Sequence, residues 1–388
     1  MKEIGIFEVH CHVKYLYTLC KICKTKDTNV TIFTNKKILS QLKEYLKDLE
    51  NYEIVLQKEN ESTNSFLKRI EKICNEKIDL LFINTFQLSC YYLPKYFSFN
   101  PNCKKIITIH TVNGWLKPRP YFNPRKIVHS IDTNLSSFIG KNFILPRFDG
   151  INVIYAPIKD YVEKKTDYDK EIYTLPFCLY EGEKSKNEKN KRLQIVVPGQ
   201  IEEHRRDYEI LMDAFETILK KYNKKIDIYL LGYPVGIYGN KIINKCIKLK
   251  EQGYNIHFYT DFVPENEYEE IMKKSDILVL SIRIKTRGMG LITEYYGITK
   301  GSAAVFEGIQ YGKPMIVPKN FNLVKQLESS TLRFLDSNNL GEVLSDLIEN
   351  KEKIYDLKEK AYKNSSFYSL KNLQLYFTEE ILSKIDKK

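Results

Sequence analysis

This sequence has no long hydrophobic run. Nowhere in its 388 residues do the roughly 18 consecutive apolar residues of a membrane-spanning helix occur. The first residues, Met1–Glu8, also lack the basic-then-apolar pattern of a secretory leader and predict an immediate β-strand. These absences predict a cytoplasmic protein, and a peripheral position at the cytoplasmic face of a membrane stays open.

Acidic residues are in the minority. Asp and Glu number 49 against 61 Lys and Arg, which gives a formal net charge of +12. No helix-turn-helix, zinc-finger or RNP-like pattern accompanies this charge, so we expect no nucleic-acid partner. Most of the excess is lysine, which more often solvates a surface than reads bases. Phosphorylated substrates and an acidic membrane surface remain open as partners.

The eight cysteines lack the paired spacing of a metal site. Cys20 and Cys23 form a single half-site inside a helical pattern, with no second pair at ligand spacing. No Asp-x-Asp pair stands at the end of a predicted strand either. We therefore predict buried thiols, no metal and no bound cofactor.

What the sequence does contain is an alternation of short apolar runs with helical patterns, which is typical of parallel α/β sheets. Hydrophobic residues make up 43% of the chain and aromatic residues 13%, enough for a packed core. The strands expected in the first half are Ile4–Val9, Val30–Thr34, Tyr52–Leu56, Asp79–Asn84, Lys105–His110, Ile151–Ala156 and Glu171–Phe177. Those expected in the second half are Leu193–Val197, Ile226–Leu231, Ile256–Phe262, Ile277–Ser281, Met315–Val317 and Leu332–Leu335.

A charged run at 181–191 contains nothing that can be buried, and it divides the chain. We predict an acceptor-side Rossmann-like domain over 1–180, a linker over 181–192 and a donor domain over 193–368. A final helix, expected to cross back to the first domain, occupies 369–388. Residues 112–149, with one Trp and four Pro, predict a long, partly irregular excursion. The fold class is thus two doubly wound parallel-sheet domains separated by a cleft, with ligands beyond the carboxyl ends of the strands.

The loop after the first strand of the second half carries two arginines. It reads Val-Pro-Gly-Gln-Ile-Glu-Glu-His-Arg-Arg-Asp-Tyr over 197–208, with Arg205 and Arg206 just before a helix. A guanidinium can grip two phosphate oxygens and stays charged in a desolvated site. Alternatively, these arginines pair with Glu202, Glu203 or Asp207 on a solvated surface.

A second loop, over 294–314, opens a helix at small residues after Gly301. Free backbone N–H groups and the positive helix end can face an anion there, with Ser302 adding a hydroxyl and Lys300 a charge. Glu307, one to two turns into the helix, can accept hydrogen bonds from a vicinal diol. The alternative is an ordinary capped helix with a surface glutamate.

Together these two loops resemble the donor half of GT-B glycosyltransferases. The resemblance covers about residues 193–320 and implies that Arg206, with Arg205, and the loop Lys300, Gly301, Ser302 and Ala303 bind the donor diphosphate. It further implies that Glu307 binds the nucleotide ribose and that Phe262 and Val263 contact the base. Retaining members carry a second glutamate eight positions before the first, where this sequence has Thr299, so a retaining outcome does not follow.

Histidines follow two strands of the first half. His110 resembles the histidine that many retaining GT-B enzymes hold near the transferred sugar, while Glu8, His12 and His110 are the candidate bases for an inverting reaction. A structural role is the alternative for each. Trp115 either anchors the long loop or stacks on a sugar or lipid.

The expected function is a metal-independent hexosyltransferase that moves a sugar from a nucleotide-diphosphate donor, its co-substrate, to a glycan or lipid-linked acceptor. Departure of a nucleoside diphosphate builds negative charge that arginine, backbone amides and a helix N-terminus stabilise. A nucleotide-sugar epimerase or hydrolase of the same fold is one alternative. A basic, non-enzymatic binding or scaffold protein is the other.

Overall fold

The computed structural model describes residues 1–117, 122–182, 192–287 and 292–385. Most of the predicted linker, 183–191, lies outside these described residues. The chain divides into two units: the first contains 1–179, 287–301 and 370–388, and the second contains 180–286 and 302–369. In the sequence, no feature indicates that 287–301 leaves the second half to join the first unit.

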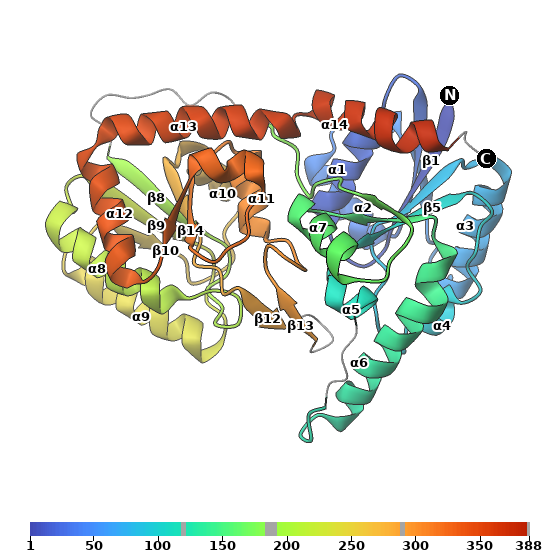
Figure 1. Ribbon diagram of the computed structural model, residues 1–388, viewed down its shortest axis with the longest axis horizontal. Helices are drawn as coiled ribbons and strands as arrows, with labels where there is room; N and C mark the ends of the chain where they lie inside the picture. Colours follow the sequence, from blue (N-terminus) through green and yellow to red (C-terminus); the bar gives the residue numbers. More distant parts are fainter. Residues whose placement is uncertain (118–121, 183–191, 288–291, 386–388) are drawn as a thin grey trace. The chain divides into compact units, whose positions relative to one another are not determined.

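The first unit, which contains β1 and β5 in Figure 1, is built on a seven-stranded parallel sheet. Its strand order is β3-β2-β1-β4-β5-β6-β7. Its strands are β1 (Lys2–Glu8), β2 (Thr28–Thr34), β3 (Glu53–Leu56), β4 (Leu80–Ile83), β5 (Lys104–Ile109), β6 (Gly150–Val153) and β7 (Glu171–Tyr173). Its helices are α1 (Val13–Cys23), α2 (Lys36–Tyr45), α3 (Thr63–Lys77), α4 (Leu93–Tyr96), α5 (Val112–Leu116), α6 (Ile127–Ile139), α7 (Ala156–Lys165) and α14 (Leu370–Tyr376).

The second unit has a six-stranded parallel sheet with strand order β10-β9-β8-β11-β14-β15. Its strands are β8 (Leu193–Pro198), β9 (Ile226–Leu231), β10 (Ile256–Phe258), β11 (Ile277–Val279), β14 (Met315–Pro318) and β15 (Thr331–Phe334). Its helices are α8 (Tyr208–Tyr222), α9 (Gly236–Glu251), α10 (Glu265–Lys274), α11 (Ala303–Gln310), α12 (Ser337–Glu349) and α13 (Lys351–Ser365). The short strands β12 (Lys285–Arg287) and β13 (Thr293–Tyr295) belong to neither large sheet.

Apolar runs form these strands because both faces of each sheet are covered. All four residues of β4 are buried, as are the last five of β1, and such two-sided burial is what a continuous apolar run predicts. The prediction of two doubly wound parallel-sheet domains is confirmed. Four expected strands are too long by two or more residues at their carboxyl ends. β6 stops at Val153 because α7 starts at Ala156-Pro157, and β7, β10 and β11 stop at Tyr173, Phe258 and Val279.

The segment 112–149, expected to be partly irregular, is mostly helical where it is described. The described part folds into α5, α6, one π-helical turn (Gly140–Ile144) and one 3-10 turn (Leu145–Arg147). Two of the four prolines that suggested irregularity, Pro118 and Pro120, lie outside the described residues. Trp115 is buried, so its ring packs inside the first unit and anchors the segment.

The chain end packs on the first unit. After α14 the helix widens into a π-helical segment, Phe377–Ile381, and closes with a 3-10 turn. Nε2 of Gln374 donates hydrogen bonds to the carbonyl oxygens of Lys21 (3.0 Å) and Lys24 (2.7 Å) at the end of α1. Phe377 is fully buried, with its ring 6.2 Å from that of Phe82 in β4. Across the described ranges, no helix combines the length and apolarity needed to cross a membrane.

Each sheet reverses its strand order at one place. In the first unit the reversal lies between β1 and β4, and in the second between β8 and β11. Connections on the two sides of such a point leave the sheet in opposite directions, so the loops after these strands open a crevice at the carboxyl edge. The loops after β1, β4, β8 and β11 are therefore where ligand-binding groups are expected.

Candidate functional site

The loop after β8 is built on two glycines packed against each other. Gly199 continues the strand by donating its N–H to the carbonyl of Leu231, 2.8 Å away, and then adopts a φ of +95°. A Cβ placed on Gly232 would fall 2.2 Å from the carbonyl oxygen of Gly199. The two loops at this edge can therefore approach only because neither position carries a side chain.

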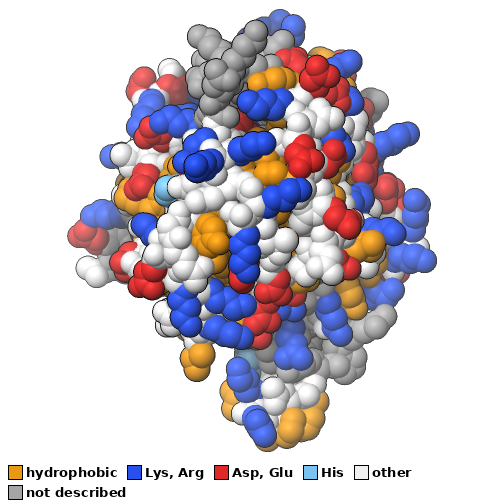
Figure 2. Space-filling view, turned by 90° about the vertical axis from the view of Figure 1, so that its left-hand side faces the viewer, with side chains coloured by type: hydrophobic (Ala, Val, Ile, Leu, Met, Phe, Trp, Pro, Cys, Tyr) orange, Lys and Arg blue, Asp and Glu red, His pale blue; other side chains and the backbone are white. Residues whose placement is uncertain are grey.

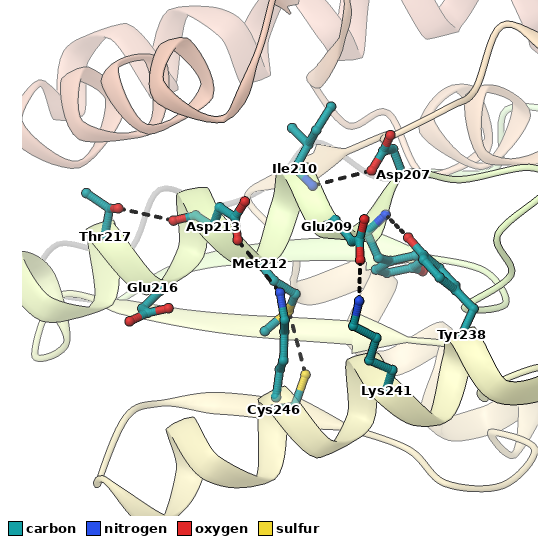
Figure 3. Close-up of polar contacts among 12 residues, drawn as sticks. Asp207, Glu209, Ile210, Met212, Asp213, Glu216, Thr217, Tyr238, Lys241 and Cys246 are labelled. Carbon is teal, nitrogen blue, oxygen red and sulfur yellow. Dashed lines mark hydrogen bonds and ion pairs between the residues drawn. The ribbon is translucent and has the colours of Figure 1, made fainter.

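The start of α8 is tied firmly to α9, which holds this loop in place (Figure 3). Asp207 accepts the N–H of Ile210 at 3.4 Å as the N-cap of α8, and the Tyr238 hydroxyl accepts the N–H of Tyr208 at 2.8 Å. Glu209 pairs with Lys241 at 2.8 Å. These capping and cross-helix contacts fix the backbone immediately after Arg206.

Arg206 lies under Gly199 at the strand-order reversal of the second unit. A Cβ on Gly199 would sit 2.2 Å from Nη2 of Arg206, so the guanidinium occupies the space that the missing side chain leaves. In the part of the chain that the structure describes, the buried Nη1 of Arg206 has no hydrogen-bond partner. The same holds for the buried hydroxyl of Ser281, whose carbonyl accepts the N–H of Asp207 at 2.8 Å. Buried polar groups are normally satisfied, so both atoms are candidates for ligand contacts.

Arg205 does not share this environment. Its side chain is more than half exposed and forms an ion pair with Glu202, Nε to Oε2 3.0 Å. This is the solvated pairing that the sequence offered as the alternative for both arginines. Its backbone carbonyl accepts the N–H of Arg283, whose guanidinium pairs with Asp207 at 3.2 Å.

Glu307 and Arg206 both lie close to the same tyrosine, Tyr268. Burial raises the pKa of the Tyr268 hydroxyl well above its ordinary value, the carboxylate of Glu307 raises it further, and the charge of Arg206 lowers it. Both charged groups thus lie around one buried ring on α10. The β8 loop and α11, about 100 residues apart in the chain, come together as the motif pair predicts.

The predicted phosphate loop spans the boundary between the units. Lys300 and Gly301 belong to the first unit, whereas Ser302 and Ala303 belong to the second. Ser302 is the N-cap of α11; its side chain makes no capping hydrogen bond, and its carbonyl accepts the N–H of Val305 at 3.1 Å. Lys300 places its ammonium 5.4 Å from the ring centre of Tyr296.

The two predicted base contacts differ in exposure. The ring of Phe262 is 75% exposed and lies 6.3 Å from that of Tyr233, so its face is open to stacking. The Val263 side chain is buried, which leaves its backbone to meet a ligand.

In the first unit, Glu8 sits at the strand-order reversal and is fully buried. One carboxylate oxygen accepts the N–H groups of His10 (2.6 Å) and Cys11 (3.1 Å), and the other accepts from Asn84 (2.7 Å) and Thr85 (2.6 Å). Burial raises the pKa of Glu8 to about 7, although these donors work in the opposite direction. With both oxygens engaged, Glu8 holds the loops after β1 and β4 together.

His12 and His110 stack on each other, with ring centres 4.1 Å apart and an interplanar angle of 20°. Nε2 of His110 lies 2.9 Å from the carbonyl oxygen of Asn84, so it carries the proton and leaves Nδ1 as an acceptor. Burial lowers the pKa of His12 to about 4 and that of His110 to about 3, with Lys300 contributing to both. The pair is therefore neutral at pH 7. His12 has a φ of 60°, a strained conformation for a residue with a side chain.

No family profile matches the chain, and no curated protein matches it in sequence. Solved structures do match. HepE of Anabaena in complex with UDP has a TM-score of 0.64 at 13% identity, over 99% of this chain and all of that chain. The UDP-GlcNAc 2-epimerase of Neisseria meningitidis bound to UDP-GlcNAc has a TM-score of 0.55 at 12% identity, over 99% and 100%. The pneumococcal O-GlcNAc transferase GtfA in complex with UDP and GlcNAc has a TM-score of 0.56 at 10% identity, over 84% and 60%.

The chain has the GT-B fold. On this fold, the strand-order reversal of the second unit brings Arg206, Ser281 and Glu307 into one region. The sequence predicted two of these three. Ser281 was missed because a serine ending a strand carries no motif, and only its burial without a partner singles it out.

Glu294 is a second residue that sequence analysis missed. It is buried, and its carboxylate accepts the N–H groups of Gly114 (3.0 Å) and Asn113 (3.3 Å) in the first turn of α5. Burial raises its pKa to about 7. Thr299, where retaining enzymes carry their glutamate, is fully buried and accepts the N–H of Tyr295 at 2.8 Å. Glu294 therefore caps α5 and holds residues 292–301 within the first unit.

Among the described residues, no group of three or more His, Cys, Asp or Glu side chains has the arrangement to hold a metal ion.

Proposed function

We propose that this protein is a nucleotide-sugar-dependent glycosyltransferase that moves a hexosyl group to a glycan or lipid-linked acceptor without a metal ion. UDP-linked sugars are the donors to test first, because HepE, GtfA and the Neisseria epimerase, which share this fold, are described in complex with UDP or a UDP-sugar. In this proposal the second unit binds the donor through Arg206, the start of α11 at Ser302 and Ala303, and Glu307. The exposed ring of Phe262 stacks on the base.

The environment of Arg206 carries the proposal. Its guanidinium is held against Gly199 at the strand-order reversal, with a buried Nη1 to which no described residue forms a hydrogen bond. Leaving a buried guanidinium N–H unsatisfied costs about 1–3 kcal/mol or more. A diphosphate oxygen would satisfy it, and the Ser281 hydroxyl offers a second donor from the neighbouring strand.

The chemistry follows from the charge that forms when the donor reacts. The bond between the anomeric carbon and the diphosphate oxygen breaks, and the electron pair leaves on the β-phosphate. A fixed cation and oriented hydroxyl and amide dipoles stabilise this charge without reorganising. The acceptor hydroxyl forms the new bond to the anomeric carbon and gives up its proton. For that proton we propose Nδ1 of His110, since Nε2 is committed to Asn84.

The direct test is calorimetric titration with UDP, UDP-glucose, UDP-GlcNAc, ADP and GDP. We expect one nucleotide to bind in the presence of EDTA, and Arg206→Ala and Glu307→Ala to weaken it at least tenfold, about 1.4 kcal/mol or more. Arg333→Ala is the matched control: that arginine lies in the same unit but is engaged by Glu328 (2.7 Å) and by the carbonyls of Lys319 and Phe321. Absence of binding to every nucleotide would contradict the proposal and favour a scaffold role.

Product analysis separates a transferase from an epimerase, the second activity that structures of this fold carry. A transferase or donor hydrolase releases UDP from a UDP-sugar, whereas an epimerase returns a UDP-sugar of altered configuration. We expect UDP release that His110→Ala slows without weakening UDP binding. An altered UDP-sugar with no UDP released would assign the protein as an epimerase.

A further inference from the structure

Helix α6 of the first unit has the reverse of the usual burial pattern of a surface helix. Five of its apolar side chains are exposed, while four small polar ones are buried. The exposed residues are Ile127, Val128, Ile131, Leu135 and Phe138. The buried polar residues are Ser130, Thr133, Ser136 and Ser137. An amphipathic helix on a globular protein ordinarily shows the reverse.

The two sets lie on opposite sides of the helix. At about 100° per residue, the five apolar residues fall within an arc of about 100°, and the buried polar residues fall within a separate arc of about 120° on the other side. Val128 is 82% exposed and Ile131 is 60% exposed. Helix α6 thus presents one continuous apolar stripe, and Figure 1 shows it projecting away from the sheet of the first unit.

The inward face explains why the helix is stable in this orientation. The Ser130 hydroxyl accepts the N–H of Asn123 at 3.0 Å and donates to the carbonyl of Lys126 at 3.0 Å. Just beyond the helix, a Cβ on Gly140 would fall 2.5 Å from Leu88 and 3.3 Å from the Trp115 ring. Small inward residues, of which Ser130 and Ser136 form local hydrogen bonds, therefore let α6 pack closely, and the apolar stripe remains for another partner.

The surroundings of the stripe are basic and aromatic. Residues 122–147 contain four basic residues, Arg125, Lys126, Lys141 and Arg147, and one acidic residue, Asp132. The carboxylate of Asp132 accepts the N–H of Cys90 at 2.7 Å, on the side of the protein. Lys141 pairs with Asp167 at 3.0 Å, but Arg125 and Lys126 are exposed beside the stripe. Figure 2 shows hydrophobic side chains next to Lys and Arg at the lower end of the view, where α6 projects in Figure 1.

Two more aromatic rings extend the stripe. Phe143 is half exposed, with its ring 6.1 Å from that of Phe138 and 6.3 Å from that of Phe97. The guanidinium of Arg147 lies 5.7 Å from the Phe97 ring centre. Cations held over aromatic rings at the edge of an apolar surface are amphipathic groups suited to a lipid–water boundary.

We infer that α6 is a membrane-docking element that lies in the surface of a bilayer containing anionic lipid. The apolar stripe enters the acyl boundary, and Arg125 and Lys126 meet the headgroup phosphates. The projecting helix can insert its apolar stripe into a deformable surface. The exposed basic residues beside the stripe favour an anionic one. This inference does not depend on the proposed catalytic activity.

Vesicle flotation tests the inference directly. We expect the wild type to float with vesicles of phosphatidylcholine and phosphatidylglycerol in equal parts, and to float weakly with phosphatidylcholine alone. The triple variant Val128→Ser/Ile131→Ser/Leu135→Ser should lose at least about tenfold in affinity, because apolar burial drives interfacial binding. Arg125→Gln/Lys126→Gln should weaken binding only to the anionic vesicles.

Leu375→Ser is the matched control, because Leu375 is also an exposed leucine on a helix of the first unit. Thermal melts check that each variant is folded. The inference is overturned if the wild type does not float with anionic vesicles or if the folded triple variant floats as well as the wild type. It is also overturned if the wild type is a dimer in gel filtration that the triple variant dissociates, since a second copy then covers the stripe.

Discussion

At the scale of single residues, the proposed donor side of this protein depends on a glycine that no motif marks as a ligand. Gly199 is required twice, once for its φ of +95° and once because Arg206 fills the place of its side chain. Arginine is the predicted ligand, but the position of its guanidinium is set by the residue seven places earlier. This coupling can be tested separately from the charge of Arg206.

Gly199→Ala should move the guanidinium of Arg206 and weaken UDP binding at least about tenfold, about 1.4 kcal/mol. It should also destabilise the fold by about 1–2 kcal/mol through backbone strain. Gly253→Ala is the control, since Gly253 has a φ of +83° with no atom within 4 Å of an added Cβ. The Gly253→Ala variant has the same backbone strain, but its added Cβ collides with no other atom, so calorimetry should show unchanged UDP binding. Equal losses of UDP binding in both variants would contradict this account.

Glu8 makes a prediction about pH. Its pKa is raised from 4.5 to about 7, so the folded chain keeps a proton that the unfolded chain loses. The resulting stabilisation is complete below pH 4.5 and is lost as pH rises through 7, with a slope of at most about 1.4 kcal/mol per pH unit. The melting temperature of the wild type minus that of Glu8→Gln should therefore be larger at pH 5 than at pH 8.

Glu59→Gln serves as the comparison for that pH series, because it removes a carboxylate that is 77% exposed in the same unit. Differential scanning calorimetry from pH 5 to pH 8 gives the melting temperatures. A constant difference between wild type and Glu8→Gln over this range would show that Glu8 does not change protonation there.

At the scale of elements, the segment 292–301 is held by the Glu294 carboxylate, which caps the short helix α5. Glu294→Ala leaves the buried N–H groups of Asn113 and Gly114 without their acceptor, which should cost about 1–3 kcal/mol. Hydrogen exchange should speed up in Val112–Leu116. Asp336→Ala, which removes the N-cap of α12 in the second unit, should leave exchange in α5 unchanged. Unaltered exchange in α5 of Glu294→Ala would contradict the capping role.

Element prediction succeeded where hydrophobic periodicity was strong. The α8 stripe of Tyr208, Leu211 and Phe215 predicts a helix over 207–222, and α8 runs from Tyr208 to Tyr222. No helix was predicted over α6. Its apolar residues face outward and its serines face the protein, so the usual pattern of a surface helix is reversed. Boundaries after β6 and β7 also moved; the end of β6 is set by the start of α7, which has Pro157 in its first turn.

At the scale of the whole molecule, the last residues of the chain complete the core of the first unit. Phe377→Ala should lower the free energy of unfolding by about 3–5 kcal/mol, because Phe377 is fully buried near Phe82. Chemical denaturation measures the loss, and hydrogen exchange should rise in β4 and α1. Leu375→Ala, an exposed position two residues earlier, is the control. Equal stability of the two variants would refute a core role for the chain end.

The sequence by itself determined the fold class, and it singled out Arg206 and Glu307, two of the three groups that we propose for the donor side. Both follow from local patterns: apolar runs of strand length, a Gly turn before a helix, and spacing within one helix. Only the tertiary structure decided that Arg205 is a surface ion pair, that Glu8 and Glu294 are buried acceptors, and that the apolar face of α6 points outward. The physical reason is burial, because whether a charge or an apolar side chain faces water depends on segments far away in the chain.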